Sequence, residues 1–507
     1  MTEVRPPQEA TRETPAPPET DVVGAAASGV LWLTAQKWII RLTGFVTIAF
    51  LTRLLVPEDF GTVAAAGTLL PFFYLFADLG FSAYIVQADR ADDRMLSTAV
   101  WFSCLAGIIL CGGLWIFAPF MGGVFKAPGV VDVLRALSMW VVITSAGAVP
   151  LAILRRRMQF RVIALQATVA AFGAQVAAIV LALRGAGVWA LVAQVLVSAL
   201  LTTAMSWVTV RWRPRFQFDY RELASMTRFG GFVVAVEVVA LGRAWGEAAV
   251  TAAVLGTAAL GLMTVAQRLV QMVQDLSGSA IVPVTNVAFA AVRSDSERLR
   301  AAYLRSLRMV ILALSLPLTV VAVAAPVLVP LMFGPGWTGS IGVTQILALA
   351  GTLTTAAWLD HGLFYGLGRP GTWLWYAVVT DAVTLATTMA LASHGLTAIA
   401  LGFLVVAIVA TVGRTAMVRA VMCVGWRSLA GPYCAVVLVV MLSGTAGWLT
   451  LRWITGSMWL TLMTTAAVVT AAHLVVSSLV ARETLTDFVG VVRRAIRSLR
   501  SRQAIAR

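Results

Sequence analysis

The chain has 507 residues, of which 60% are hydrophobic and only 12% charged, and its mean hydropathy is +0.88. Soluble domains are typically about 45–50% apolar and about 25% charged, so this composition excludes a soluble globular protein and indicates a polytopic membrane protein. The net charge of +15 does not indicate nucleic-acid binding, because the cations lie in short loops between apolar segments, as the positive-inside rule requires.

Motifs of several enzyme classes are missing from the sequence. A P-loop requires a Lys followed by Ser or Thr, whereas Lys37 precedes Trp38 and Lys126 precedes Ala127. The four cysteines form no C-x-x-C pair and the three histidines are far apart, so neither a disulfide framework nor a metal site is expected. We therefore expect a protein that is not an enzyme and that uses no cofactor.

The predicted elements begin with a polar tail and continue with a series of apolar segments. Residues 1–27 are rich in Pro, Glu and Thr and contain no early apolar stretch, so they predict a disordered cytoplasmic tail rather than a signal peptide. About fourteen apolar segments follow, each near the roughly 20 residues that a helix needs to cross a bilayer. The predicted spans cover residues 28–55, 61–84, 96–118, 130–151, 161–183, 187–210, 229–254, 259–291, 304–331, 340–366, 372–393, 396–420, 430–452 and 457–480.

The loops between these spans fall into two sets of different charge. About 29 of the 38 cations lie in one set and in the two tails, and about five lie in the other set. Because short cytoplasmic loops hold most of the Arg and Lys, this asymmetry predicts that both termini are cytoplasmic. The opposite loops have at most about ten residues, which leaves no room for the folded loop with acid/base groups that membrane glycosyltransferases and polymerases generally need.

Two stretches about 200 residues apart resemble each other. "TRLLVPEDFGTVAAAG" (Thr52–Gly67) is similar to "AAVLGTAALGLMTVAQ" (Ala252–Gln267), and this alignment places Gly61 on Gly261. A second similarity joins "PFMGGVFKAPG" to "VPLMFGPGW". Chance similarity between Ala-, Gly- and Leu-rich segments is the alternative. Both similarities agree in order with the span count, however, and parallel repeats are typical of transporters with a site between two lobes.

The fold class that follows is an all-α polytopic membrane protein with about 14 transmembrane helices. Two six-helix lobes are related by a parallel repeat, and an extra helix pair follows them. The expected parts are the tail 1–27, an N-lobe 28–210, a cytoplasmic linker 211–228, a C-lobe 229–420, the extra spans 430–480 and a basic tail 481–507. The basic tail is amphipathic, which predicts that it lies on the anionic cytoplasmic leaflet.

Several motifs resemble one known family. "LTRLLVPEDFGTVAAAGTLLPFFYLFADLGFSAYIVQ" (Leu51–Gln87), "LGTAALGLMTVAQRL" and "FGPGW" are similar to polysaccharide-type flippases of the Wzx class. These belong to the MOP exporter superfamily, with the drug/cation antiporters and the lipid II flippase, and the chain looks most like exporters of colanic-acid-like and teichuronic-acid-like polymers. The resemblance covers roughly residues 28–425. It implies a flippase that moves an undecaprenyl-pyrophosphate-linked oligosaccharide to the outer leaflet of the bacterial cytoplasmic membrane for surface polysaccharide export.

Cations lie well inside the first predicted span. Lys37 and Arg41 are four residues apart and share one helix face. At 1.5 Å per residue they lie about 15–21 Å from the cytoplasmic end of the span. A charge at the bilayer centre costs at least about 2.5–3.5 kcal/mol, so these side chains are expected to face a water-filled cavity or a partner.

Further polar residues gather in spans 7 and 8, the equivalents of spans 1 and 2 in the repeat. Arginine binds pyrophosphate through its bidentate fork, and a Gln amide both donates to and accepts from sugar hydroxyls. The predicted pyrophosphate contacts are Lys37, Arg41, Arg243 and Arg268. The predicted glycan contacts are Gln36, Gln267 and Gln271.

Structural ion pairs are the alternative for the same charges. Arg243 could pair with Glu237 or Glu247, and Arg268 could pair with Asp275 or Glu247. A coupling ion could bind a carboxylate of this region or Asp78, but Asp78 lies in an Asp–Leu–Gly turn and is expected to be structural. Two further acids, Asp360 and Asp381, are expected to lie near helix ends in contact with solvent.

Two other functions remain open. A drug or cation antiporter on the same scaffold would have a cavity dominated by carboxylates, whereas this sequence places cations on spans 1, 7 and 8. A membrane glycosyltransferase or polymerase would need a long external loop with acidic residues. The expected partners are a lipid-linked oligosaccharide and membrane lipids. The basic tail could also dock a polysaccharide polymerase or a glycosyltransferase.

Overall fold

The computed structural model describes residues 39–88, 92–278, 289, 295–454, 456–482, 484 and 486. Within these ranges the regular secondary structure is helical, without strands. Eleven helices of this part are long and apolar enough to cross a membrane by their length and composition. The all-α polytopic fold is thus confirmed, whereas the count of about fourteen spans stays a prediction. The predicted tail 1–27 lies outside the described residues.

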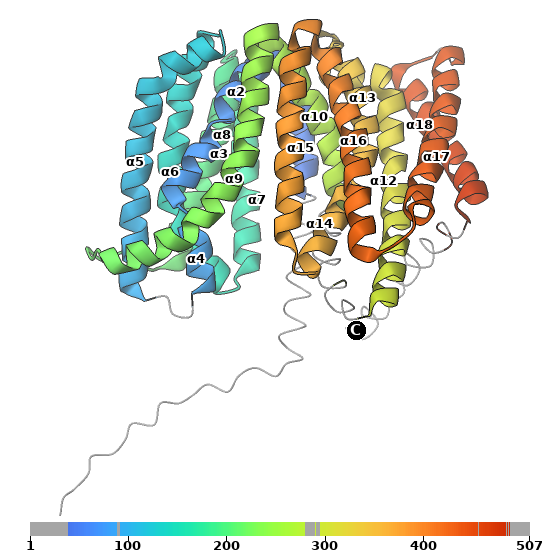
Figure 1. Ribbon diagram of the computed structural model, residues 1–507. Helices are drawn as coiled ribbons and strands as arrows, with labels where there is room; N and C mark the ends of the chain where they lie inside the picture. Colours follow the sequence, from blue (N-terminus) through green and yellow to red (C-terminus); the bar gives the residue numbers. More distant parts are fainter. Residues whose placement is uncertain are drawn as a thin grey trace, which may run out of the picture.

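The first half of the chain forms a compact group of helices on the left of Figure 1. Within it α6 packs against both α5 and α8, and α8 also packs against α7. The elements are a helix over 39–54, α2 (Pro57–Gly67), α3 (Leu70–Asp78), α4 (Phe81–Gln87), α5 (Asp93–Val124), α6 (Gly129–Arg156), α7 (Phe160–Leu183) and α8 (Val188–Val210).

The second half begins with α9, which lies on the left against α3, α4 and α5, and continues across the middle and right of the same view (Figure 1). Here α13 packs against α10, α12 and α16, and the last two helices pack against each other and against α12. The elements are α9 (Tyr220–Leu255), α10 (Thr257–Gly278), α12 (Ser296–Phe333), η1 (Pro335–Trp337), α13 (Ser340–Thr354), α14 (Ala356–Gly366), α15 (Pro370–Leu391), η2 (Ala392–His394), α16 (Leu396–Met422), α17 (Trp426–Trp453) and α18 (Met458–Val480).

Different residues cap the helices at the two ends of the bundle. At the end where α5, α9 and α12 begin, the side chains of Asp92, Asp219 and Asp295 accept hydrogen bonds from backbone N–H groups of the first turn. We call this the arginine-rich end, because Arg155, Arg156 and Arg157 also lie here, where α6 ends. At the opposite end α9 and α12 stop at Gly256 and Gly334, whose φ angles are 88° and 94°. A left-handed residue of this kind is accessible to glycine without steric cost.

One predicted span is interrupted. Instead of one helix over 61–84, the chain forms α2, α3 and α4, and it breaks after Asp78 where Leu79 and Gly80 have φ angles of 44° and 73°. The Asp78 carboxylate is buried and accepts a hydrogen bond of 2.6 Å from the Ser82 hydroxyl. Asp78 therefore lies at the break, in a local contact that joins α3 to α4.

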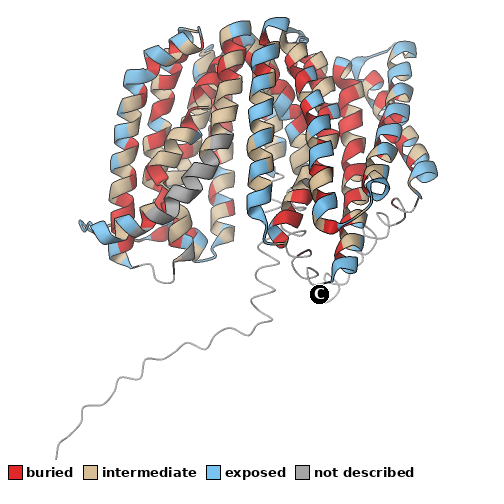
Figure 2. Cartoon of the chain, in the orientation of Figure 1, coloured by how far each residue is buried: buried red, intermediate tan, exposed pale blue. Residues whose placement is uncertain are grey.

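The outer face of the bundle is apolar, as a membrane requires. Figure 2 shows exposed residues along α5 and α17, toward the two sides of this view, and along α15 in its middle. Many of these exposed side chains are large and hydrophobic, among them Ile116, Trp375, Val379 and Met441. In water such a continuous apolar surface would drive aggregation, whereas in a bilayer it contacts acyl chains.

The two halves approach most closely where α2 crosses α10. A Cβ atom added to Gly61 would lie 1.7 Å from the carbonyl oxygen of Thr257, and one added to Gly261 would lie 1.8 Å from that of Pro57. The contact is reciprocal, since each glycine faces the start of the other helix, and it joins the two glycines that the internal similarity aligned. Only glycine permits this backbone approach.

Further contacts join the halves near this crossing. The indole Nε1 of Trp337 donates to the carbonyl oxygen of Thr52 at 2.9 Å, and Phe60 packs edge-on against the Trp337 ring. Arg53 donates to the carbonyl oxygen of Leu331 at 2.8 Å. Hydrogen bonds and an apolar cluster thus close the bundle at the end opposite the arginine-rich end.

We expect Gly61→Ala to lower the melting temperature of the detergent-solubilised protein. The added methyl group cannot avoid the Thr257 backbone unless the helices separate, and overpacking typically costs about 1–3 kcal/mol. Gly67→Ala is the matched control on the same helix, because a Cβ there meets nothing within 4 Å. If Gly61→Ala and Gly67→Ala melted at the same temperature, the described crossing would be wrong.

Candidate functional site

A cavity of about 1210 Å³ lies between the two halves. Helices α2, α3, α6 and α8 of the first half line one side, and α9, α10, α13, α15 and α16 of the second half line the other. Most of the wall is apolar, so the polar groups that reach the cavity are few and distinct. They include Gln194, Arg243, Glu247, Gln267, Arg268, Gln271, Gln274, Asp381 and Arg414.

Helix α10 supplies the largest polar face of the cavity. Gln267, Arg268, Gln271 and Gln274 follow one another at helical spacing and all line it. The side chains of the first three are exposed to the cavity rather than packed in the helix bundle. Two of the predicted glycan contacts and one predicted pyrophosphate contact are therefore brought together on one helix face.

Arg268 is the cation of this face. Among the residues that the structure describes, none forms an ion pair or a hydrogen bond with its guanidinium group. The alternative pairings with Asp275 and Glu247 are not formed in this conformation. Among the described residues, this positive charge in the cavity wall is thus left available to an anion.

Arg243 also reaches the cavity, but acids on both sides neutralise it. Its Nη1 lies 2.7 Å from Oε1 of Glu247, and its Nε lies 2.8 Å from Oδ1 of Asp381. All three side chains line the cavity. Two carboxylates and one guanidinium leave an excess of one negative charge here. The expectation that Asp381 lies near a helix end is wrong, because it lies inside α15 and pairs with Arg243.

Arg41 forms a bridge between the halves instead of facing the cavity. Its Nη2 lies 3.1 Å from Oδ2 of Asp275, and its Nη1 donates to the Asp275 carbonyl oxygen at 2.8 Å. Neither residue lines the cavity. Gln36 and Lys37 lie outside the described residues, and so does the side chain of Glu237. Of the four predicted pyrophosphate contacts, only Arg268 is placed as an unpaired cation at the cavity.

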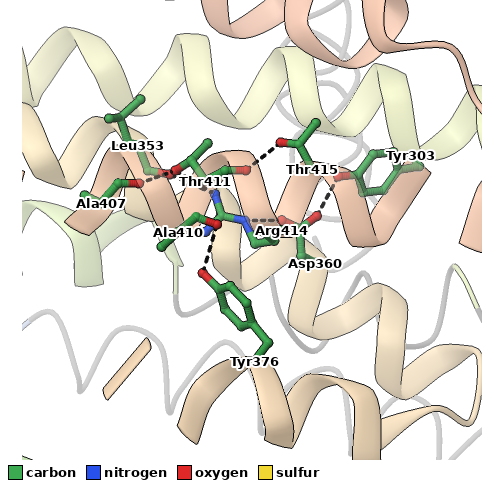
Figure 3. A network of polar contacts seen from close by, with 9 residues as sticks. All are labelled: Tyr303, Leu353, Asp360, Tyr376, Ala407, Ala410, Thr411, Arg414 and Thr415. Carbon is green, nitrogen blue, oxygen red and sulfur yellow. Dashed lines mark hydrogen bonds and ion pairs between the residues drawn. The ribbon is translucent and has the colours of Figure 1, made fainter. Parts of the chain in front are cut away.

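A buried ion pair lies beside the cavity (Figure 3). Arg414 and Asp360 are each 1% exposed, and the Arg414 Nε lies 2.5 Å from Oδ2 of Asp360. The other carboxylate oxygen accepts a hydrogen bond of 2.5 Å from the Tyr303 hydroxyl. The expectation of a solvated Asp360 is therefore wrong, since its charge is compensated inside the protein by Arg414 of α16, and Tyr303 of α12 adds a hydrogen bond.

The same arginine reaches the break between α13 and α14. Its Nη2 donates to the carbonyl oxygen of Leu353 at 3.1 Å, next to Thr355, where the two helices meet (Figure 3). A helix break leaves carbonyl oxygens without intrahelical donors, so the guanidinium satisfies one of them. The sequence contained a signal for this role, because Arg414 is a cation inside a predicted span, where cations are costly.

A bundle of apolar helices with a cavity that contains a few polar side chains between two halves is the arrangement typical of membrane transporters. The family model described as "Polysaccharide biosynthesis protein" matches residues 50–342, more than half of the chain. The chain belongs to this family. The resemblance found in the sequence is thereby confirmed at the level of the family.

Three relatives are named for the biosynthesis of polysaccharides. The succinoglycan biosynthesis transport protein ExoT of Rhizobium meliloti (strain 1021) is 27% identical over 67% of this chain and 69% of its own length. The teichuronic acid biosynthesis protein TuaB of Bacillus subtilis (strain 168) is 23% identical over 64% and 68%. The lipopolysaccharide biosynthesis protein WzxC of Escherichia coli (strain K12) is 24% identical over 64% and 67%.

Solved structures share the fold. The lipid II flippase MurJ in an inward closed conformation superposes with a TM-score of 0.75 at 11% identity, covering 90% of this chain and 100% of that one. An inward-facing multidrug resistance MATE family transporter of the MOP superfamily gives 0.59 at 18% identity, covering 75% and 98%. The chain therefore has the MOP transporter fold.

Proposed function

We propose that the protein is a flippase for an undecaprenyl-pyrophosphate-linked oligosaccharide, which it moves from the inner to the outer leaflet of the bacterial cytoplasmic membrane. Its family and its relatives' roles in polysaccharide biosynthesis support this proposal. In this orientation the arginine-rich end and both termini face the cytoplasm. The single observation that carries the proposal is the position of Arg268 in the cavity between the halves, without an ion-pair or hydrogen-bond partner among the described residues.

The chemistry of the substrate explains why such a cavity is needed. Each sugar hydroxyl that enters hydrocarbon without a hydrogen-bond partner costs several kcal/mol, so an unaided oligosaccharide crosses very slowly. A polar cavity lowers this barrier while the polyprenyl chain stays in the lipid. Gln267 and Gln271 would exchange hydrogen bonds with the glycan, and the neighbouring Gln274 adds a third amide on the same face.

Arg268 would bind the pyrophosphate. Its planar fork can donate two parallel hydrogen bonds to phosphate oxygens, and no carboxylate of the described residues competes for it. Lys37 remains a candidate for the same role, and Arg41 could join only after its pair with Asp275 opens. Outward movement of the anion also runs with an inside-negative potential, by about 2.3 kcal/mol per charge per 100 mV.

Alternating access would require the halves to separate at the α2–α10 crossing and to approach at the arginine-rich end. Rocking of two repeats around a central site is the usual motion of such transporters. A coupling ion would have carboxylates available in Glu247 and Asp381, with Glu237 and Asp78 as further candidates. A polysaccharide polymerase or glycosyltransferases remain the expected protein partners.

An antiporter of drugs or other cations is the second candidate. The excess negative charge around Arg243, Glu247 and Asp381 favours it, because such a cluster attracts cations. The cavity also contains Arg268, which repels them, and the matching family consists of polysaccharide biosynthesis proteins. The flippase therefore remains the better-supported function.

Proteoliposomes distinguish the two functions. Purified protein is reconstituted with a fluorescent undecaprenyl-pyrophosphate-linked oligosaccharide, and the fraction accessible to an added glycosidase is followed with time. We expect accessibility in protein-containing vesicles to rise well above that in protein-free vesicles. In the same vesicles a fluorescent organic cation should not be exchanged for protons or sodium. Cation exchange without oligosaccharide transfer would instead support the antiporter.

A further inference from the structure

A second pocket, of about 410 Å³, lies at the arginine-rich end, away from the central cavity. It is formed by the early part of α12, the start of α17 and the end of α18. Three arginines and two hydroxyl residues contribute its polar lining. They are Arg308, Arg427, Arg482, Ser428 and Thr484.

The electrostatic character of this pocket is strongly positive. No acidic residue is found among its lining residues in the part of the chain that the structure describes. Arg427 and Ser428 belong to the first turn of α17, whose preceding Gly425 supplies no side-chain cap. The free N–H groups and the dipole of a helix start attract anions. Arginine side chains and a helix N-terminus therefore point to the same class of ligand.

The remaining wall of the pocket is apolar. Leu312, Val436 and Leu479 line it, and Leu479 is 79% exposed at the outer surface of α18. Above the pocket, exposed apolar side chains continue along the outside of the helix pair, among them Val437 and Val475. A ligand that matches both the basic lining and the apolar surface beside it has an anionic group at one end and hydrocarbon chains at the other.

We propose that this pocket binds the headgroup of an anionic phospholipid from the leaflet at the arginine-rich end, with its acyl chains along α17 and α18. Basic pockets between transmembrane helices at the cytoplasmic side are suited to such headgroups. The volume falls in the range of about 300–1,000 Å³ that is usual for small-molecule sites. Because the pocket lies between α12 and the helix pair α17 and α18, the bound lipid would link this pair to α12. The proposal does not depend on the transported substrate.

Native mass spectrometry of the detergent-solubilised protein tests the site. Protein is titrated with palmitoyl-oleoyl-phosphatidylglycerol or with the zwitterionic phosphatidylcholine of the same chains. We expect phosphatidylglycerol to bind more tightly, and Arg427→Gln/Arg482→Gln to weaken it by about tenfold, since each lost guanidinium removes a charge-assisted hydrogen bond. Arg308 is not substituted in this variant, because it makes a further interaction within the protein. Arg157→Gln/Arg161→Gln, in exposed arginines of the first half at the same end, should keep the wild-type affinity.

A second pair of variants fills the pocket without removing charge. Gly431 lines it, and a Cβ there meets nothing within 4 Å, so Gly431→Leu should fold and occlude the site. Gly413→Leu on α16 is the control, because its Cβ is equally free and lies outside both cavities. We expect only Gly431→Leu to lose phosphatidylglycerol. Equal lipid retention by both glycine variants would overturn the proposal. So would displacement of the lipid by an equal concentration of inorganic phosphate, which would reveal a site for free anions.

Discussion

Replacing Arg268 with alanine is expected to reduce transfer of the lipid-linked oligosaccharide by about 30- to 5,000-fold, since truncating one partner of a desolvated charge pair typically costs about 2–5 kcal/mol. The variant should still fold, because the guanidinium forms no ion pair or hydrogen bond with the described residues. The measurement is the initial rate of glycosidase accessibility in proteoliposomes, with the melting temperature of each purified variant.

Matched variants separate the charge of Arg268 from its shape. Arg268→Lys keeps the charge but loses the bidentate fork, so an intermediate rate is expected. Gln267→Ala removes a neighbouring amide of the same helix face and should slow transfer only several-fold, because a neutral hydrogen bond contributes about 0.5–1.5 kcal/mol. If Arg268→Ala transferred the oligosaccharide at the wild-type rate, the assignment of Arg268 to the substrate site would be wrong. A large fall in its melting temperature would instead show a structural role.

Breaking the buried pair of Arg414 and Asp360 is expected to have the largest effect on stability. Arg414→Leu leaves the Asp360 carboxylate 1% exposed without its counter-charge, and removing one partner of a buried ion pair typically costs about 3–5 kcal/mol. The Tyr303 hydroxyl bond cannot neutralise that charge. Thermal unfolding in detergent, followed by circular dichroism, measures the loss.

Two further variants control this experiment. Arg414→Leu/Asp360→Leu removes both charges, and we expect it to recover much of the lost stability because no uncompensated charge remains. Arg161→Leu replaces an exposed arginine and should leave the melting temperature within about one degree, as surface substitutions change stability little. If Arg414→Leu and Arg161→Leu had the same melting temperature, the ion pair of Arg414 and Asp360 would contribute nothing to the stability of the protein.

Hydropathy and charge placement predicted the class of fold because each apolar helix must satisfy its own backbone in lipid. Breaks within spans were harder to predict. Leu79 adopts a left-handed conformation between α3 and α4 although leucine rarely does, and Thr355 separates α13 from α14 without any glycine or proline. At the break between α13 and α14 a tertiary contact takes part, because Arg414 donates a hydrogen bond to the Leu353 carbonyl oxygen. Such contacts are not encoded in local sequence.

The candidate site was predictable where it depends on one helix and unpredictable where it depends on several. The stripe of Gln267, Arg268 and Gln271 follows from helical spacing alone. The partner of Arg243 on α15 and the partner of Arg41 on α10 lie on helices distant in sequence. Spacing can identify a buried charge, but only packing decides which acid neutralises it.

The direct test of the account is the affinity of the purified protein for undecaprenyl pyrophosphate, compared between wild type and Arg268→Ala. An anion held by an unshared guanidinium in the cavity wall should bind at least about tenfold more weakly once that group is gone. The same titration with Arg161→Ala should match wild type, which excludes a general effect of surface charge. Equal affinities of wild type and Arg268→Ala would contradict the claim that this arginine receives the pyrophosphate.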